Sequence, residues 1–367
     1  MTGKGVSTSM PETLADLRSL RPERVCIIKP SSLGDVVHAL PVLSALRALW
    51  PGAEITWVVN SSIRGLLDGH PQLDRVIAFD RSRARLGLDG LAMMTRFLAS
   101  LHRERFDLAL DLQGLLRSGL MTLATGARVR VGLSDAREGA ARFYTHRIPS
   151  PGPDIHAVDR LLCVAEALGA SIAEPRFVVA ISEADRRWAR GALAEVARPA
   201  LVLNLGARWL TKRWPPEHFA EVARRAVEVR GAGLVAVGSP EDRPLVEALR
   251  ARLPGVSLLD LSGRTSLPQL AALAAESDLF LSNDTGPLHL AAAAGARVVG
   301  VYTCTSPGRT GPYGPNAAAV QSCVWCAPSF LKTCPRLECL VELSPDRVWP
   351  TVSAGLEGRE SARPTAA

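Results

Sequence analysis

Short apolar segments of strand length alternate with amphipathic segments of helix length along most of this 367-residue chain, and no other feature restricts the fold as strongly. Such an alternation predicts βαβ units and a parallel sheet. In the first half we predict strands at 25–29, 54–59, 75–80 and 106–112, and helices at 36–49, 91–104 and 114–124. Residues 128–180 are less regular, contain the Pro- and Gly-rich stretch 149–156, and lead to a domain boundary expected near 175–195.

The alternation restarts after this boundary. We predict strands at 200–206, 233–239, 256–261, 278–283 and 297–303, and helices at 216–230, 242–253, 267–276 and from about 287. The expected fold class is therefore α/β, with two doubly wound domains at 21–180 and 181–356, an N-terminal extension at 1–20 and a disordered tail at 357–367. Ligands of such sheets bind beyond the carboxyl ends of the strands, so a cleft between the two domains is the expected active site.

Composition excludes several classes of protein. No run of about 18 apolar residues is present, so we expect no membrane-spanning helix. The first 20 residues lack an apolar signal core, which predicts a cytoplasmic location. The net charge of +7 fits an anionic partner, but the basic residues are dispersed, so nucleic acid is not expected. Only four basic residues are lysine, namely Lys4, Lys29, Lys212 and Lys332.

The stretch KPSSLGDVVH, residues 29–38, follows the first predicted strand and opens the first predicted helix. One interpretation is a capped turn, in which Ser or Asp satisfies free backbone N–H groups and Gly34 allows a tight bend. The other is a catalytic site, because Asp35 lies at the carboxyl edge of the strand and a carboxylate there could act as a general base. We expect the serines to cap the helix and leave Asp35 available for chemistry.

A second candidate is SNDTGPLHLAAAAG, residues 282–295, in which Asp284, Thr285, Gly286 and His289 converge on the start of a helix. Free N–H groups at a helix start bind anions, although a capped, buried helix with an incidental histidine is the alternative. Lys212, in LGARWLTKRWPPEHF at 205–219, suits a diphosphate or belongs to a solvated loop.

Asp242, in VGSPEDR at 237–243, is placed to hydrogen-bond a ribose or to stabilise a helix N-terminus. No G-x-G-x-x-G sequence follows a predicted strand, and no Walker A sequence exists. Both absences disfavour a nicotinamide-dependent enzyme and a nucleoside triphosphatase.

Taken together, IIKPSSLGDVVHALPVL, KRWPPEHF, VGSPED and SNDTGPLHLAAAAG resemble the signature segments of glycosyltransferase family 9, the ADP-heptose:lipopolysaccharide heptosyltransferases. The resemblance extends in the same order from about residue 24 to 350. It implies a GT-B architecture, with two Rossmann-like domains facing across a cleft. It also implies an inverting, metal-independent transfer of heptose from ADP-heptose to the inner core of lipopolysaccharide.

The resemblance also implies roles for individual residues. Asp35 corresponds to the general base and Lys212 to the lysine that faces the donor phosphates. Asp242, Asp284, Thr285, Gly286 and His289 correspond to donor-binding residues, and Lys29, Arg117, Arg137 and His156 to basic residues on the acceptor side. The implied acceptor is lipid A–core at the inner membrane surface, so peripheral membrane contact is expected. KRWP resembles the second heptosyltransferase and SSLGDVVHALP the first, which leaves the acceptor hydroxyl open.

Cys323, Cys326, Cys334 and Cys339 form a C-x2-C-x7-C-x4-C cluster. We consider structural zinc, a redox-sensitive or disulfide-bonded cluster, and reduced packing thiols as alternatives, and expect no cofactor for catalysis. The amphipathic segment 91–105 either touches a membrane surface or packs on its own sheet.

Two other functions stay open at this point. One is a GT-B transferase that uses another nucleotide sugar for a cell-surface glycan, and the other is a non-catalytic nucleotide-sugar-binding protein. The presence of both Asp35 and the 284–289 segment favours an enzyme over a binding protein.

Overall fold

The structure is a computed structural model that describes residues 16–80 and 88–357. The chain divides into two compact units: the first ends at Arg176, the second begins at Phe177, and residues 32–37 are grouped with the second. The predicted N-terminal extension and C-terminal tail lie outside the described residues, except for residues 16–20 and Glu357. Among the described residues, no helix has the length and apolar character needed to cross a membrane.

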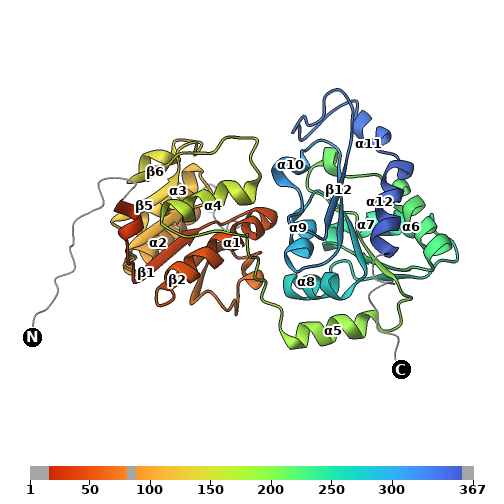
Figure 1. Ribbon diagram of the computed structural model, residues 1–367, viewed down its shortest axis with the longest axis horizontal. Helices are drawn as coiled ribbons and strands as arrows, with labels where there is room; N and C mark the ends of the chain where they lie inside the picture. Colours follow the sequence, from red (N-terminus) through yellow and green to blue (C-terminus); the bar gives the residue numbers. More distant parts are fainter. Residues whose placement is uncertain (1–15, 81–87, 358–367) are drawn as a thin grey trace, which may run out of the picture. The chain divides into compact units, whose positions relative to one another are not determined.

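The first unit is built on six parallel strands in the order β3-β2-β1-β4-β5-β6 (Figure 1). The strands are β1 (Arg24–Ile28), β2 (Glu54–Asn60), β3 (Arg75–Phe79), β4 (Leu108–Asp111), β5 (Val129–Leu133) and β6 (His146–Ile148). The helices are α1 (Leu33–Leu49), α2 (Leu88–Arg103), α3 (Leu116–Ala124) and α4 (Ala157–Ala167). The central strand β1 is fully buried over Val25–Ile28, which explains its continuous apolar sequence.

The region 128–180 is more regular than the sequence suggests, since it contains β5, β6 and α4. Strand β5 pairs with β4 and with β6, and β6 has only three residues, His146, Arg147 and Ile148. A strand this short and polar carries little periodic signal, and its formation depends on the backbone hydrogen bonds that β5 offers. The helix α1 also begins at Leu33 rather than at 36, so Asp35 lies in its first turn.

The second unit repeats this architecture with six parallel strands in the order β12-β11-β10-β7-β8-β9. The strands are β7 (Ala200–Asn204), β8 (Gly233–Val237), β9 (Leu258–Asp260), β10 (Leu279–Asn283), β11 (Val298–Tyr302) and β12 (Ala317–Gln321). The α-helices are α5 (Glu183–Leu193), α6 (Pro216–Arg230), α7 (Arg243–Arg250), α8 (Leu267–Glu276), α9 (Gly286–Ala293), α10 (Pro307–Thr310), α11 (Glu338–Glu342) and α12 (Pro345–Glu357). The sequence analysis did not identify β12, α5 or the helices after β11.

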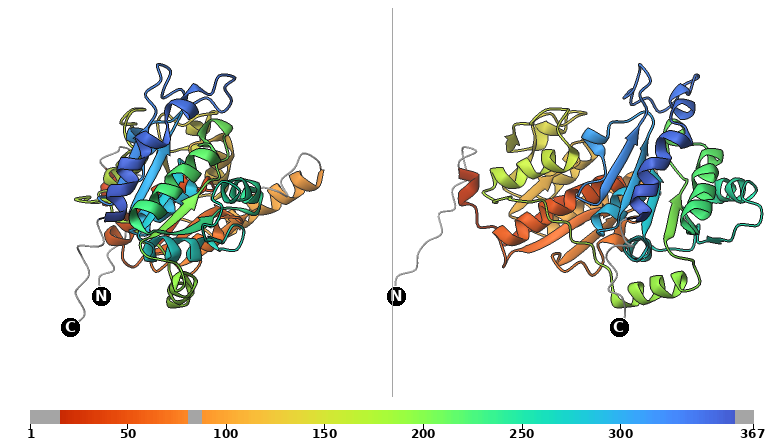
Figure 2. Two further views of the ribbon diagram at one scale, coloured as in Figure 1. Left: turned by 90° about the vertical axis from the view of Figure 1, so that its right-hand side faces the viewer. Right: turned by 45° about the vertical axis from the view of Figure 1, so that its right-hand side comes forward.

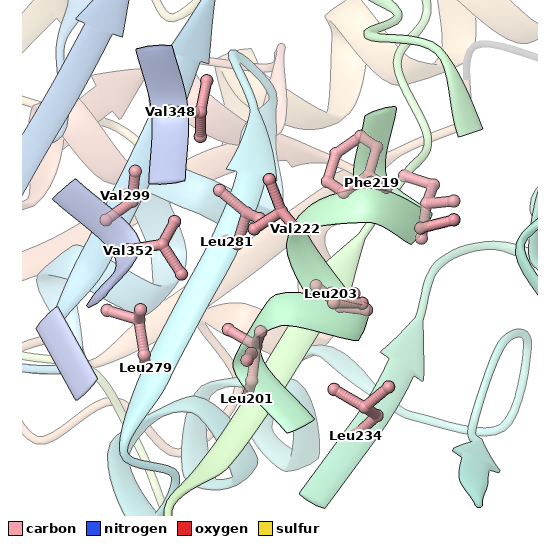
Figure 3. Close-up of a cluster of buried hydrophobic side chains, with 14 of the residues drawn as sticks. Leu201, Leu203, Phe219, Val222, Leu234, Leu279, Leu281, Val299, Val348 and Val352 are labelled. Carbon is pink, nitrogen blue, oxygen red and sulfur yellow. The ribbon is translucent and has the colours of Figure 1, made fainter. Parts of the chain in front are cut away.

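Helices α6 and α12 pack side by side against the second sheet (Figures 1 and 2). Helix α6 begins at Pro216 and ends before Gly231, whose φ of +62° suits glycine at a helix C-terminus. Phe219 from α6 and Val352 from α12 meet Leu281 of β10 in the core, and all three are fully buried (Figure 3). Each such side chain stabilises the fold by about 1.5–3 kcal/mol relative to an exposed one.

Both sheets have the same topology, because in each the chain runs outward from a central strand to one edge and then returns to build the other edge. The topological switch point lies between β1 and β4 in the first unit and between β7 and β10 in the second. Ligands of open α/β sheets bind beyond the carboxyl ends of the strands at this point. The predicted fold class, two doubly wound α/β domains, is confirmed, and the predicted site residues Lys29 and Asp284 directly follow β1 and β10.

Candidate active site

Asp35 lies in the turn between β1 and α1, where it is half-buried and held by Ser32. The Ser32 hydroxyl donates to the Asp35 carboxylate over 2.6 Å, and the Ser32 backbone N–H donates to the same oxygen over 3.0 Å. The expectation that the serines would leave Asp35 uninvolved in capping is therefore wrong. A carboxylate at the third helical position commonly accepts from the N-cap residue in this way, so Asp35 anchors the helix start as well as being the candidate base.

The predicted acceptor-side cations of the first unit gather around the loop that follows β4. Lys29 is buried, with 5% of its surface exposed, and its ammonium group donates to the carbonyl of Leu112 over 2.9 Å. The Arg137 backbone N–H donates to the carbonyl of Gly114 over 2.9 Å. Arg117 lies on α3 with its exposed guanidinium 6.0 Å from the ring of Phe79. Lys29 therefore has a structural contact, whereas both arginines point their charges toward solvent.

The sequence analysis missed Asp111, which organises this loop. Its buried carboxylate accepts from the backbone N–H groups of Gln113 and Gly114, each over 2.9 Å, and from the hydroxyls of Ser118 and Tyr144 over 2.9 and 2.7 Å. Burial raises the pKa of Asp111, although these hydrogen bonds oppose the rise. The available signal was the sequence Asp-Leu-Gln-Gly at 111–114, in which a strand ends in an acidic residue shortly before a glycine.

His156 forms the N-cap of α4, where its Nδ1 accepts from the backbone N–H of Val158 over 3.2 Å. Its ring meets the ring of His38 edge to face, with centroids 5.5 Å apart. His38 is buried on α1, one turn after Asp35. The predicted acceptor-side histidine is thus linked by a direct ring contact to the helix that carries the candidate base.

In the second unit, three polar side chains converge on Asp284, directly after β10. Its Oδ2 lies 2.5 Å from the ammonium nitrogen of Lys212 and accepts from the Thr305 hydroxyl over 2.7 Å. Its Oδ1 lies 3.3 Å from Nε2 of His289. Lys212 comes from the 3-10 helix η4 (Leu210–Lys212) after β7, and Thr305 from the loop after β11. The sequence predicted three of these residues but not their contact, and it missed Thr305.

The electrostatics of this cluster keep Asp284 ionised. Burial alone would raise the pKa of the Asp284 carboxyl, because only 3% of the side chain is exposed. The hydrogen bond from His289 and the charge of Lys212 outweigh burial and hold that pKa well below its usual range. Lys212 and Asp284 therefore form a buried ion pair at the carboxyl edge of the sheet.

Two asparagines fix the loops that carry this pair. Asn204, the last residue of β7, donates to the hydroxyls of Ser282 and Thr285 over 2.8 and 3.1 Å. Asn283, the last residue of β10, accepts from the backbone N–H of Trp214 over 3.0 Å. Thr285 is the N-cap of α9 and Gly286 its first residue, so the predicted donor segment starts the helix as expected.

Asp242 caps the short helix η5 (Pro240–Asp242) after β8. Its carboxylate accepts from the backbone N–H and hydroxyl of Ser239 over 2.8 and 2.9 Å. The same carboxylate lies against Gly206, where a Cβ would come within 2.4 Å of its oxygens. Gly206 thus brings Asp242 to the end of β7, on the same edge of the sheet as Lys212.

The cysteines show neither disulfides nor a metal site. All seven cysteines are free thiols. Within residues 16–80 and 88–357, no group of three or more histidine, cysteine or acidic side chains is arranged to hold a metal ion. Cys323 accepts from the guanidinium of Arg347 over 3.1 Å, and burial raises the pKa of Cys339. Cys323 is exposed and the other three cysteines of the cluster are only partly buried, so all three alternatives for the cluster stay predictions.

The sequence of the chain is similar to those of known glycosyltransferases. The model of glycosyltransferase family 9 (heptosyltransferase) matches residues 94–340. Lipopolysaccharide heptosyltransferase 1 of Pseudomonas aeruginosa is 33% identical to the chain over 93% of its length and 100% of the relative. Lipopolysaccharide core heptosyltransferase OpsX of Haemophilus influenzae is 32% identical over 80% of the chain and 82% of the relative.

Solved structures show the same fold. The E. coli heptosyltransferase WaaC with ADP is 26% identical, with a TM-score of 0.71, over 90% of this chain and 99% of that chain. WaaC with ADP-2-deoxy-2-fluoro heptose is 27% identical, with a TM-score of 0.69, over 90% and 99% of the two chains. The two Rossmann-like domains are therefore those of the GT-B architecture.

Proposed function

The chain belongs to glycosyltransferase family 9, and from this premise we propose that it transfers heptose from ADP-heptose to the inner core of lipopolysaccharide. The transfer inverts the anomeric carbon and uses no metal ion. The observation that carries the proposal is the cluster of Lys212, Asp284, His289 and Thr305 at the switch point of the second sheet. It lies where a nucleotide sugar binds in an open α/β sheet.

The donor side is supported by the composition of this cluster. Lys212 offers an ammonium group, and α9 begins at Gly286, whose backbone N–H lies at the positive end of the helix. Both features stabilise a leaving diphosphate electrostatically. Asp242, held at the same sheet edge, accepts from the ribose hydroxyls of the donor. Binding of ADP and of an ADP-heptose analogue by the relative WaaC agrees with this donor class.

The acceptor side consists of Asp35, Lys29, Arg117, Arg137 and His156. Asp35 removes the proton from the acceptor hydroxyl, and the basic residues bind acidic groups of the acceptor through charge-assisted hydrogen bonds. The exposed guanidinium groups of Arg117 and Arg137 support this role. Lys29 contributes through its bond to the Leu112 carbonyl, which holds the β1 and β4 ends together.

The donor class and the absence of a metal requirement are tested together. We expect calorimetry to show binding of ADP-heptose and ADP but not of UDP or GDP sugars, and we expect turnover to be undiminished in EDTA. Release of ADP only when lipid A–core is present distinguishes a transferase from a non-catalytic binding protein. A strict Mg²⁺ requirement, or preference for a UDP or GDP sugar, contradicts the proposal.

We further propose that the first unit contacts the membrane in which the acceptor lies, and that α3 provides the contact. Leu116, Leu120 and Leu123 are 45%, 40% and 46% exposed and follow one face of the helix. Helix α2 packs against α3, and arginines 96 and 103 on α2, 117 on α3 and 128 after it are exposed. Apolar side chains bordered by cations fit an anionic phospholipid surface.

The other alternative for the segment 91–105, packing on its own sheet, is supported by its apolar side chains. Met94, Phe97 and Leu98 pack against a core that includes Leu101 and Met121. Leu91 is 66% exposed and Arg96 and Arg103 are exposed as well, so this part of α2 stays available for the proposed membrane contact.

Replacing Leu116, Leu120 and Leu123 together with serine is expected to abolish co-sedimentation with anionic phospholipid vesicles, because the apolar contact is lost. The wild type should sediment with anionic vesicles and much less with zwitterionic ones. Val229→Ser is a control, since Val229 is 59% exposed on α6 in the other unit. Equal sedimentation of the triple variant and wild type contradicts the proposed surface.

A further inference from the structure

The ion pair in the donor site leaves its charge balance incomplete. Lys212 is the cation expected to face the donor diphosphate, yet its ammonium nitrogen lies 2.5 Å from the Asp284 carboxylate, which is ionised. The charges of the pair cancel, so Lys212 cannot by itself compensate a diphosphate. A nucleotide sugar needs further cations at this edge of the sheet.

A second lysine lies at the same place. The ammonium nitrogen of Lys212 lies 4.6 Å from the ring centroid of Trp209, and the ammonium nitrogen of Lys332 lies 5.5 Å from the same centroid. Both distances are within the range of a cation–π contact. In the part of the chain that the structure describes, no carboxylate forms an ion pair with Lys332, and its side chain is exposed. Lys332 therefore brings an uncompensated charge to the ring that Lys212 also contacts.

Specific hydrogen bonds hold the backbone around Lys332 in place. The Thr211 hydroxyl, which is buried in η4 beside Lys212, donates to the carbonyl of Leu331 over 2.7 Å. The backbone N–H of Phe330 donates to the carbonyl of Cys304 over 2.8 Å. Cys304 precedes Thr305, which donates to Asp284. The segment is thus tied to both loops that build the Asp284 cluster.

A third cation borders the same segment. The guanidinium of Arg309, on α10, lies 4.6 Å from the ring centroid of Phe330. Residues 330–332 therefore lie between the Trp209 loop and α10, with a cation on each side. Part of the cysteine-rich segment 323–339 is therefore in contact with the loops that carry Lys212 and Thr305.

We propose that Lys332 is a second donor-binding cation, which contacts the diphosphate of the nucleotide sugar together with Lys212. The proposal rests on the proposed function, because it assumes that a nucleoside diphosphate binds at Asp284. Trp209 keeps the two ammonium groups close together, and the bonds to Leu331 and Phe330 prevent the segment from moving away. Lys332 supplies the positive charge that the Lys212–Asp284 pair lacks.

The test compares Lys332→Ala with Arg336→Ala. Arg336 is an exposed cation on the same segment, but its guanidinium lies 5.4 Å from the centroid of a different ring, that of Trp325. By calorimetry with ADP, we expect about five- to ten-fold weaker binding for Lys332→Ala and no more than two-fold for Arg336→Ala, as for loss of one exposed but specific ion pair. Lys332→Arg should recover part of the affinity. Thermal unfolding verifies that each variant is folded.

Two comparisons separate this inference from the proposed function. The loss caused by Lys332→Ala should be larger for ADP than for adenosine, which carries no phosphate. If the wild type does not bind ADP, the proposed function is wrong. If the wild type binds ADP and Lys332→Ala binds it equally well, only the role of Lys332 is wrong. Equal losses in Lys332→Ala and Arg336→Ala also contradict the proposal, since they indicate a nonspecific effect of charge.

Discussion

Asp35→Asn is expected to lower the turnover rate about 100-fold or more, because a sugar hydroxyl is a poor nucleophile until a base removes its proton. Affinity for the donor should stay within a few-fold of wild type, since the proposed donor-binding residues, Lys212, Asp242, Lys332 and the 284–289 segment, do not include Asp35. The amide keeps the shape of the side chain, and its carbonyl oxygen can still accept from Ser32. Turnover measured by ADP release, together with calorimetry on the same protein, checks both expectations.

Ser32→Ala is the matched control for the capping role of Asp35. It removes the hydroxyl that donates over 2.6 Å to the carboxylate and leaves the carboxylate itself. Loss of an N-cap hydroxyl lowers the free energy of unfolding by about 1 kcal/mol. We expect turnover to remain within a few-fold of wild type. If Ser32→Ala and Asp35→Asn lose turnover equally, or if Asp35→Asn keeps the wild-type rate, Asp35 is only a helix cap.

The sequence was sufficient for those parts of the fold that local patterns determine. Strands such as β1 and β10 are continuous apolar runs, and α6 has proline at its start and glycine at its end, so its bounds at 216 and 230 were predicted correctly. Strand β12, AAAVQ, consists mostly of alanine, which has a low propensity for strands, and it forms because β11 offers a parallel partner. The sequence of residues 317–321 alone does not show that such a partner strand will lie beside them.

The site was predictable as a set of residues but not as a set of contacts. Lys212 and Asp284 were both singled out as site residues. Nothing in the sequence indicates, however, that these two side chains, 72 positions apart, form a hydrogen bond with each other. Thr305 and Asn204 carried no motif, and they act only because the topology brings β7, β10 and β11 together. Asp35 follows Ser32 by three residues, which is the spacing of an N-cap residue and an acidic residue that hydrogen-bond each other at a helix start. This local signal was present in the sequence, but the sequence analysis assigned the capping to the serines alone.

The Lys212–Asp284 pair provides the second large effect. Lys212→Met is expected to lower the free energy of unfolding by about 2–4 kcal/mol. The reason is that the Asp284 carboxylate, of whose side chain only 3% is exposed, loses its ion-pair partner. The value lies toward the lower part of the usual range, since 18% of the Lys212 side chain is exposed. Donor affinity and turnover should fall as well, because the diphosphate loses one of its two proposed cations. Denaturant unfolding and ADP calorimetry measure the two effects separately.

The double variant Lys212→Met/Asp284→Asn distinguishes a structural role of the pair from a functional one. Removing both charges eliminates the buried, unpaired carboxylate, so the free energy of unfolding should return to within about 1 kcal/mol of wild type. Donor binding and turnover should stay below the wild-type values, because Lys212 is one of the two ammonium groups proposed to contact the diphosphate and only Lys332 is left. Recovery of turnover together with stability indicates that the pair only holds the loops after β7 and β10 in place.

A pH dependence provides an independent check on the same pair. The pKa of Asp284 is held well below its usual range, so its contribution to stability is fully present above the ordinary aspartate pKa of about 3.9 and is lost as the pH falls below that value. The double variant has no ionisable group at position 284. The difference in free energy of unfolding between wild type and the double variant should therefore shift against the wild type below about pH 4. A difference that stays constant to pH 3 indicates that Asp284 ionises no more readily in the folded chain than in the unfolded one, and the ion pair is then not what stabilises this loop.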